Sequence, residues 1–285
     1  MIPEMTMIQG IGKNFFVMDN LGAKKPLTFN QMKTLSKQAE EFNQPINGYV
    51  LLETSRQKET DCQAKIYYPD YEENLFSASA LCSVGHYLAS HLIDQPQFVI
   101  ETNFANLKVR QLPEEAYYQV EIAPVRIGMN ESFQKIEPKD ILLNQPCVKD
   151  EVELTYSFVS ILKPHLIVFV PTDWLENKSK LEEIIEEFNQ RYDLKGHHIA
   201  VSFVAEISET NISIQTYEWT HGWVLGSGKS AAAASLAYTL RFSQPFYQKI
   251  TVNYPTVSLT TVVHQDQDDN YWLELIAPAT LFKLQ

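Results

Sequence analysis

The fold is decided by one stretch of the chain, Gly222-Trp-Val-Leu-Gly-Ser-Gly-Lys-Ser-Ala-Ala-Ala-Ala-Ser-Leu-Ala-Tyr-Thr-Leu240. Gly226, Ser227 and Gly228 predict a tight turn, and the alanine- and leucine-rich run 230–240 predicts a helix. Side chains this small suit a helix that is buried on nearly all sides. Its N-terminus would offer N–H groups and partial positive charge to a carboxylate or a phosphate. The alternative is a plain packing helix with a glycine entry turn.

The same stretch also resembles the end of a nucleotide-binding P-loop, because Gly228-Lys229-Ser230 copies its final residues. That motif requires a further glycine at the place of Trp223. The nearest glycine, Gly222, is one residue out of register. The sequence therefore gives little support to a phosphate loop.

Composition bounds the class of protein. The chain has 285 residues, of which 45% are hydrophobic, and a formal net charge of −12. This length allows one large or two medium domains with real cores. The negative charge argues against a nucleic-acid surface, which needs clustered lysine and arginine. No signal-like N-terminus and no apolar run long enough for a bilayer are found, so we expect a cytoplasmic protein without a membrane partner.

The cysteines and histidines indicate neither a disulfide framework nor a metal site. Cys62, Cys82 and Cys147 are widely spaced and odd in number. His197 and His198 are neighbours, and neighbouring residues cannot both face one metal ion from a regular strand. We expect no metal and no cofactor.

Helical and strand patterns alternate along the chain. An amphipathic helix is predicted at 27–42, opening near Thr28, and a charged one at 175–192. A second small-residue helix is predicted at 77–92. The proline-spaced stretch 123–151 predicts a linker or a long connection. The predicted strands cover 15–18, 49–52, 64–68, 98–102, 107–111, 117–122, 154–162, 166–170, 199–205, 212–217, 248–253, 257–263 and 271–275.

Each half of the chain therefore runs as strand, surface helix, strands, small-residue helix and further strands. This is a loose internal repeat of structural order. It predicts an α+β fold in which two pseudo-symmetric β-rich domains each wrap around a buried central helix. The N-termini of both helices would then lie at an active-site cleft between the domains.

Five ordered pieces of the chain resemble diaminopimelate epimerase and the wider fold family that includes phenazine-biosynthesis isomerase-like proteins and proline racemase. These pieces are 10–19 (Gly-Ile-Gly-Lys-Asn-Phe), 67–88, Pro164-His165, Tyr217-Glu218 with Gly228, and Ala277-Pro278-Ala279. The resemblance covers nearly the whole chain. It implies an N-terminal domain of residues 1–124, to which a strand at 277–285 returns, and a C-terminal domain of residues 125–276.

The catalytic positions depart from the family pattern. The family's racemases use two cysteines, and the matching positions here are Ser77 and Ser227. A serine hydroxyl is much harder to deprotonate than a thiol, and no histidine is placed by sequence to activate either serine. We therefore do not expect a two-cysteine racemase. Cys82 is interpreted as a small buried apolar residue.

The substrate-binding positions have changed as well. Where the epimerase carries asparagines, this chain has Lys13, Tyr68, Lys163 and Ala200. Lysines from three segments and two helix N-termini would make the cleft cationic and suit a small anionic molecule, unless the lysines point to solvent. The resemblance implies these further substrate-binding candidates: Ser79, His165, Trp219, Gly228, Lys229 and Ser230.

The phenazine-type isomerases have no catalytic cysteines and use a glutamate in the segment Phe-x-Pro-x-x-Glu-x-Pro-Phe-Ala-Gly-His. Glu73 and Phe76 match that segment, whereas Pro69 is one residue out of register. Its closing Ala-Gly-His corresponds here to the run 77–79, Ser-Ala-Ser, and the acidic partner of the second domain is absent at 225–231.

Two main hypotheses remain. One is a cofactor-independent isomerase of biosynthesis that acts on an anionic substrate, with Glu73 as base or acid and Glu218 as second candidate. The other is a catalytically retired homologue that binds an anionic ligand or a partner. Glu73 would then be an ordinary surface glutamate.

A third hypothesis is a partner-binding subunit of a biosynthetic complex. Trp219 and Trp223 flank the expected site, where they would wall it off or stack on a conjugated substrate. A homodimer is left open.

Overall fold

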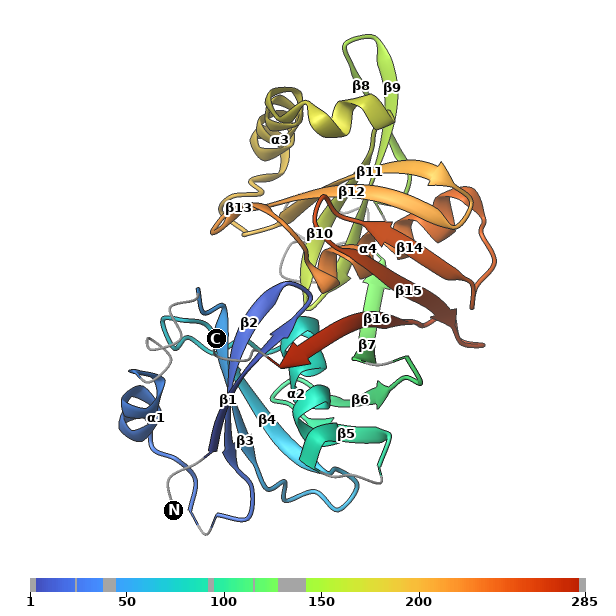
Figure 1. Cartoon of the computed structure of the whole chain (residues 1–285). Helices are drawn as coiled ribbons and strands as arrows, with labels where there is room; N and C mark the ends of the chain where they lie inside the picture. Colours follow the sequence, from blue (N-terminus) through green and yellow to red (C-terminus); the bar gives the residue numbers. More distant parts are fainter. Residues whose placement is uncertain are drawn as a thin grey trace. The chain divides into compact units, whose positions relative to one another are not determined.

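A computed structural model describes residues 4–23, 25–37, 45–91, 95–114, 116–127 and 142–281. The chain divides into two compact units, coloured along the sequence in Figure 1. Unit 1 comprises Met1–Glu121 with Ile276–Gln285, and unit 2 comprises Ile122–Leu275. The predicted α+β class is confirmed, because strands dominate both units and each holds a buried helix.

Unit 1 is a mixed sheet in which seven strands lie in chain order, from β1 to β7. The end of β16 pairs antiparallel with β1, where Gly10 faces Ala279. The β2–β3 and β4–β5 pairs are parallel, and each needs a helical crossover, α1 and α2 respectively. The elements are β1 (Glu4–Gly10), β2 (Lys13–Asn20), α1 (Phe29–Ser36), β3 (Gly48–Glu53), β4 (Cys62–Tyr67), α2 (Ala78–His91), β5 (Gln97–Glu101), β6 (Asn106–Gln111), β7 (Tyr117–Ile127) and β16 (Tyr271–Leu281).

Unit 2 repeats this order of pairings. Its strands run β15-β14-β12-β11-β10-β9-β8, and the short β13 pairs with β12. The parallel pairs β10–β11 and β12–β14 are crossed over by α3 and α4. The elements are β8 (Gln145–Lys149), β9 (Val152–Ile161), β10 (Lys163–Phe169), the 3₁₀ helix η3 (Thr172–Glu176), α3 (Lys178–Tyr192), β11 (Ala200–Ser208), β12 (Asn211–Glu218), β13 (Gly222–Val224), α4 (Gly228–Phe242), β14 (Lys249–Asn253) and β15 (Ser258–Gln265).

The central helices need small residues because strands approach them closely. A Cβ atom at Gly10 of β1 would lie 2.2 Å from the Ser79 carbonyl oxygen of α2. A Cβ at Gly85 of α2 would lie 2.5 Å from Val109 Cγ1. In α4 all four alanines of the run 231–234 are fully buried. The prediction that both small-residue helices are buried is confirmed.

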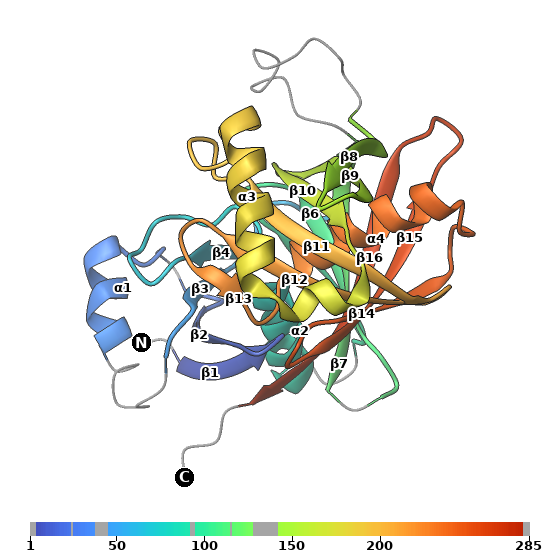
Figure 2. The ribbon, with the colours of Figure 1, turned by 90° about the horizontal axis from the view of Figure 1, so that it is seen from above.

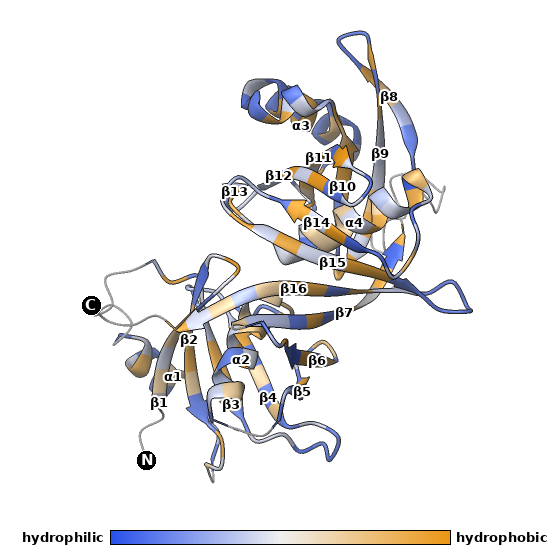
Figure 3. Ribbon diagram, turned by 45° about the vertical axis from the view of Figure 1, so that its right-hand side comes forward, coloured by the Kyte–Doolittle hydropathy of each residue, from blue (hydrophilic) through white to orange (hydrophobic). Residues whose placement is uncertain are grey.

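Each unit also has a surface helix, α1 in unit 1 and α3 in unit 2. It covers the sheet face opposite the central helix of that unit. Helix α1 begins at a Thr28 capping box with Gln31 and packs Met32 and Leu35 against the sheet. Helix α3 crosses the strands of unit 2 and shows many hydrophilic residues along its ribbon (Figures 2 and 3). Its apolar side packs on Leu166, Phe203 and their neighbours. The charged amphipathic character predicted for this segment is confirmed.

Some boundaries differ from those predicted. The β1 strand was not predicted, and β8 lies within the stretch that was expected to be a connection. The charged helix begins at Lys178 with Asn177 as its cap, after the separate 3₁₀ turn η3. The predicted ends of two helices, 38–42 and Leu92, lie outside the described residues.

Candidate functional site

The N-terminus of α4 is built as a buried polar corner of unit 2. Ser227 is the N-cap, and its Oγ accepts from the Ser230 N–H at 3.4 Å and from the Ser230 hydroxyl at 3.1 Å. Ser227 is 5% exposed. The Tyr254 hydroxyl donates to the Ser227 carbonyl at 3.0 Å, so a residue that follows β14 holds the turn in place.

A polar row on the sheet faces this corner. His165, Ala200 and Glu218 occupy matching positions on β10, β11 and β12, and their side chains therefore share one face. The next row on the same face carries Ser202 and Thr216, whose hydroxyls lie 2.9 Å apart. The Thr216 hydroxyl lies 3.4 Å from the Tyr254 hydroxyl, and this contact connects the row to the cap of α4.

His165 is the most unusual residue of the row. It is 5% exposed, and its Nδ1 atom has no hydrogen-bond partner in the described part of the chain. Burial, with a further contribution from the nearby Lys229 ammonium, lowers the pKa of His165 to about 3, while Glu218 acts in the opposite direction. The imidazole is therefore neutral at physiological pH. A buried neutral imidazole with an unused nitrogen is costly unless a ligand or water satisfies it.

Two charged side chains flank His165. Lys229 is half-buried in the first turn of α4, and Glu218 ends β12 with its side chain 25% exposed. A carboxylate oxygen of Glu218 lies 3.4 Å from His221 Nδ1. One cation, one carboxylate and one neutral imidazole thus lie beside a helix N-terminus, which can hold an anionic group and exchange a proton with it.

Unit 1 carries the corresponding helix N-terminus at Ser77. The Ser77 Oγ accepts from the Ala80 N–H at 3.2 Å, and Ser77 is half-buried. The adjacent β1–β2 turn has positive φ at Ile11 and at Gly12, and it presents the half-buried Lys13. Ser79 is buried in the first turn of α2, where its carbonyl lies against Gly10.

Glu73 lies just before α2 and is exposed. It forms a β-bridge with Tyr67, and its carboxylate accepts a hydrogen bond from the Asn103 amide. Tyr68 is half-buried, and its N–H donates to the Glu72 carbonyl at 2.8 Å. Compared with the polar row of unit 2, Glu73 lies in a more open environment.

Known proteins are similar to this chain in sequence and in fold. No family model matches it. A diaminopimelate epimerase from Enterococcus faecalis is 30% identical to it in an alignment that covers 98% of this chain and 87% of that protein. The chain belongs to the diaminopimelate epimerase family. A diaminopimelate epimerase from Lactiplantibacillus plantarum is 28% identical, covering 100% of this chain and 89% of that protein.

Solved structures at low sequence identity share the fold. A phenazine biosynthesis protein from Bacillus anthracis has a TM-score of 0.70 at 12% identity, covering 98% of this chain and 96% of that one. A hydroxyproline epimerase from Agrobacterium vitis has a TM-score of 0.63 at 14% identity, with coverages of 98% and 90%. Together with the relatives above, these structures confirm the predicted superfamily and the epimerase-like fold.

The cysteines of this epimerase-family chain are unsuited to proton abstraction. Burial raises the pKa of both Cys62 and Cys82 to about 12, and both are fully buried. The interpretation of Cys82 as a small buried residue is confirmed. Desolvation also raises the pKa of Cys147, which is half-buried beside α3. Ser77 and Ser227, the serines that the resemblance matches to the family's cysteines, each accept a hydrogen bond from an N–H group of the first helical turn.

Two tryptophans named as site candidates lie apart from the polar row. Trp219 and Trp223 pack against the core cluster under α3, on the sheet face opposite Glu218. The Trp219 indole donates to the Ile199 carbonyl at 2.9 Å, and the Trp223 indole donates to Glu182 of α3 at 2.9 Å. Within unit 2 these tryptophans therefore lie on the sheet face opposite the polar row, and the expectation that they flank a ligand site stays a prediction. Lys163 is exposed at the start of β10.

Sequence reasoning did not find Tyr254, Thr216 and Ser202. No motif marks these residues, since Ser202 and Thr216 come from two neighbouring strands and Tyr254 from the loop after β14, and they meet only in the folded unit. Within the described residues, no group of three or more histidine, cysteine, aspartate or glutamate side chains is placed to hold a metal ion. No described helix is long and apolar enough to cross a membrane.

Proposed function

We propose that this protein is a cofactor-independent isomerase that moves a proton on a small anionic substrate bound at the N-terminus of α4. The observation that carries the proposal is His165, which is buried and neutral near Lys229 and Glu218, and whose Nδ1 has no hydrogen-bond partner among the residues that the structure describes. Buried unpaired polar atoms are rare in folded proteins and mark sites where a partner is expected. Membership of an epimerase family supports the reaction class.

The anionic group of the substrate would lie against the first turn of α4. The N–H groups of that turn and the helix dipole favour negative charge. The Lys229 ammonium adds a full positive charge there, in a protein whose net charge is −12. The neutral His165 would donate or accept one hydrogen bond and fix the orientation of the substrate.

Proton transfer would fall to carboxylates. Glu218 is the candidate in unit 2, because it lies on the same face as His165 and its charge reaches both His165 and Tyr254. Glu73 is the candidate in unit 1, where it precedes the cap of α2. An isomerase needs one group to take the proton and one to return it, so both carboxylates are tested.

A catalytically retired, ligand-binding protein is the second candidate. It is supported by the serines at both family cysteine positions, since each hydroxyl serves as a helix cap. The same corner of α4 would then bind its anion without turnover. Both candidate functions predict that an anion binds at α4, but only the isomerase predicts proton exchange on the bound molecule.

The test is deuterium incorporation from heavy water, followed by mass spectrometry, into a panel of carboxylic acids. Diaminopimelate is tested first because the relatives are named as diaminopimelate epimerases. We expect exchange with wild type and a loss of about 10²-fold or more in Glu218→Gln, the usual worth of a general base. Glu209→Gln, an exposed glutamate of the same unit, is the matched control.

Three outcomes separate the candidates. Exchange that depends on Glu218 supports the isomerase. Exchange that is unchanged in Glu218→Gln but lost in Glu73→Gln would move the base to unit 1. Binding of an acid without exchange, together with weaker binding of that acid in Lys229→Ala, would leave the retired protein.

A further inference from the structure

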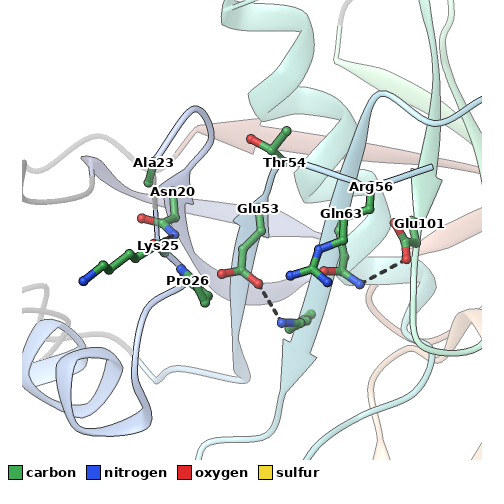
Figure 4. Close-up of a pocket in the computed structure, with 10 residues that line it drawn as sticks. Asn20, Ala23, Lys25, Pro26, Glu53, Thr54, Arg56, Gln63 and Glu101 are labelled. Atoms are coloured by element: carbon green, nitrogen blue, oxygen red, sulfur yellow. Dashed lines mark hydrogen bonds and ion pairs between the residues drawn. The ribbon is translucent and has the colours of Figure 1, made fainter. Parts of the chain in front are cut away.

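A polar pocket lies in unit 1 on the sheet face opposite α2. Its volume is about 580 Å³. Figure 4 shows the residues that line it. Asn20, Glu53, Gln63 and Glu101 occupy one row across β2, β3, β4 and β5, so their side chains share a face. Along β3, Tyr49 and Leu51 face the same way and pack in the cluster under α1. The pocket therefore adjoins the α1 side of the sheet and is built within unit 1 alone.

Glu53 is the unusual residue of this pocket. It is 7% exposed, and its Oε2 pairs with the Lys65 ammonium at 2.6 Å. Its Oε1 has no hydrogen-bond partner within the described residues. A buried carboxylate oxygen without a donor carries a desolvation cost that a ligand N–H group would relieve.

The other carboxylate of the row is already satisfied. One oxygen of Glu101 accepts from the Gln63 amide at 3.2 Å, and the other accepts from the Ser55 hydroxyl. Figure 4 shows the Gln63–Glu101 contact and the Glu53 pair as dashed lines. Of the two carboxylates in this row, Glu53 is therefore the one with an oxygen that lacks a hydrogen-bond donor among the described residues.

Two cationic side chains of the pocket could bind an anionic group of a ligand. Lys25 and Arg56 line the pocket and lie on either side of Glu53 in Figure 4. Across the described ranges, the structure records no ion pair for either side chain. An arginine fork that faces a pocket suits a carboxylate, which it binds in a bidentate manner.

We propose that this pocket is a second small-molecule site, which binds an α-amino acid as its zwitterion. The ammonium group would donate to Glu53, and the carboxylate would pair with Arg56 and Lys25. Lys65 has a flexible stem, so its ammonium can remain on one oxygen of Glu53 while the ligand takes the other. The pocket volume falls in the range of small-molecule sites and leaves room for a polar side chain.

The ligand charge follows from the lining. Lys25, Arg56 and Lys65 carry three positive charges against two negative charges on Glu53 and Glu101. A neutral or acidic amino acid therefore fits better than a basic one. L-glutamate is the probe, and glutarate, which has both carboxylates but no ammonium, is its matched control compound.

The experiment is isothermal titration of the full chain with each compound. We expect L-glutamate to bind about tenfold more tightly than glutarate, because only glutamate can donate to Glu53. Arg56→Ala should weaken L-glutamate binding about tenfold or more. Arg110→Ala removes a comparable exposed arginine of unit 1 that does not line the pocket, and it should bind as wild type does.

Glu53→Gln tests the ammonium contact directly. This variant should bind L-glutamate and glutarate equally, and its melting curve shows whether it folds. Should it fail to fold, Arg56→Ala still decides the proposal, since that side chain is exposed.

The proposal is independent of the α4 site and can fail separately from it. Binding that is lost in Lys229→Ala and unchanged in Arg56→Ala would belong to α4 and would overturn the second site. Absence of L-glutamate binding in wild type, or equal affinity for glutarate, would overturn it as well.

Discussion

The two central helices begin in the same way but in different surroundings. Both α2 and α4 start at a serine whose hydroxyl accepts an N–H of the first turn. Ser227 is buried and held by Tyr254, in the unit that also holds His165, a buried histidine whose Nδ1 has no hydrogen-bond partner among the described residues. Ser77 is half-buried, and the glutamate that precedes it is exposed. The repeated fold thus provides two equivalent helix ends, of which unit 2 has the more enclosed polar corner.

The largest expected effect concerns His165 in acid. Its pKa of about 3 in the folded chain lies below the ordinary 6.5, so the unfolded chain binds the proton more tightly. Above about pH 6.5 the histidine is neutral in both states and does not affect the free energy of unfolding. Between about pH 6.5 and pH 3 the unfolded state takes up the proton, so the free energy of unfolding falls by about 1.4 kcal/mol per pH unit. All four tryptophans lie in unit 2, so their fluorescence follows the unfolding of that unit.

His165→Gln should flatten this acid loss in urea unfolding measured between pH 7 and pH 4. His221→Gln, which removes an exposed histidine of the same unit, should keep the wild-type slope. Equal slopes in wild type and His165→Gln would contradict the burial of a neutral imidazole and would weaken the contrast between the two units.

The next effect tests the close packing around α2. Gly10→Ala would force a methyl group against the Ser79 carbonyl, and backbone cannot move aside easily. We expect a loss of about 1–3 kcal/mol or more in unfolding free energy, the usual range for overpacking. Far-UV circular dichroism in denaturant measures it. Gly85→Ala would meet the Val109 and Tyr118 side chains rather than backbone, so it should cost somewhat less. The reverse order would mean that β1 tolerates displacement.

A smaller effect compares the two caps directly. Ser227→Ala and Ser77→Ala each remove one hydrogen bond to a first-turn N–H, worth about 0.5–2 kcal/mol. Ser227→Ala should lie at the upper end, because it also removes the acceptor of the buried Ser230 hydroxyl. Hydrogen exchange of the two helices, read by mass spectrometry, separates the losses. Equal costs would show that burial adds nothing to the α4 cap.

The smallest effect concerns the two lysines near the helix ends. Lys229→Ala should weaken binding of an anionic ligand about severalfold, and added salt should reduce the difference. Lys13→Ala, at the β1–β2 turn of unit 1, should have less effect if the anion binds at α4. Titration at two ionic strengths checks both variants. A stronger effect of Lys13→Ala would place the anion in unit 1.

The sequence predicted the repeated strand and helix order because small-residue helices and alternating strands leave local patterns. The Ala-rich run 231–234 is an example, since alanine favours a helix and its small side chain suits close packing, and all four alanines are fully buried. The strand β8 was missed because its proline and exposed residues imitate a connection. Ser77 and Ser227 were found by resemblance, and their role as caps became visible with the backbone.

The sequence by itself determined the α+β fold class, with a buried small-residue helix in each half, and the acidic net charge of −12. Only the tertiary structure decided that His165 is buried with no partner for its Nδ1 in the described part of the chain, that Tyr254 holds the α4 turn, and that Trp219 packs against the core cluster under α3. The reason is that strand register and face depend on pairing between distant segments. A shift of one residue reverses the face of every side chain, and no local pattern records that choice at the end of a strand.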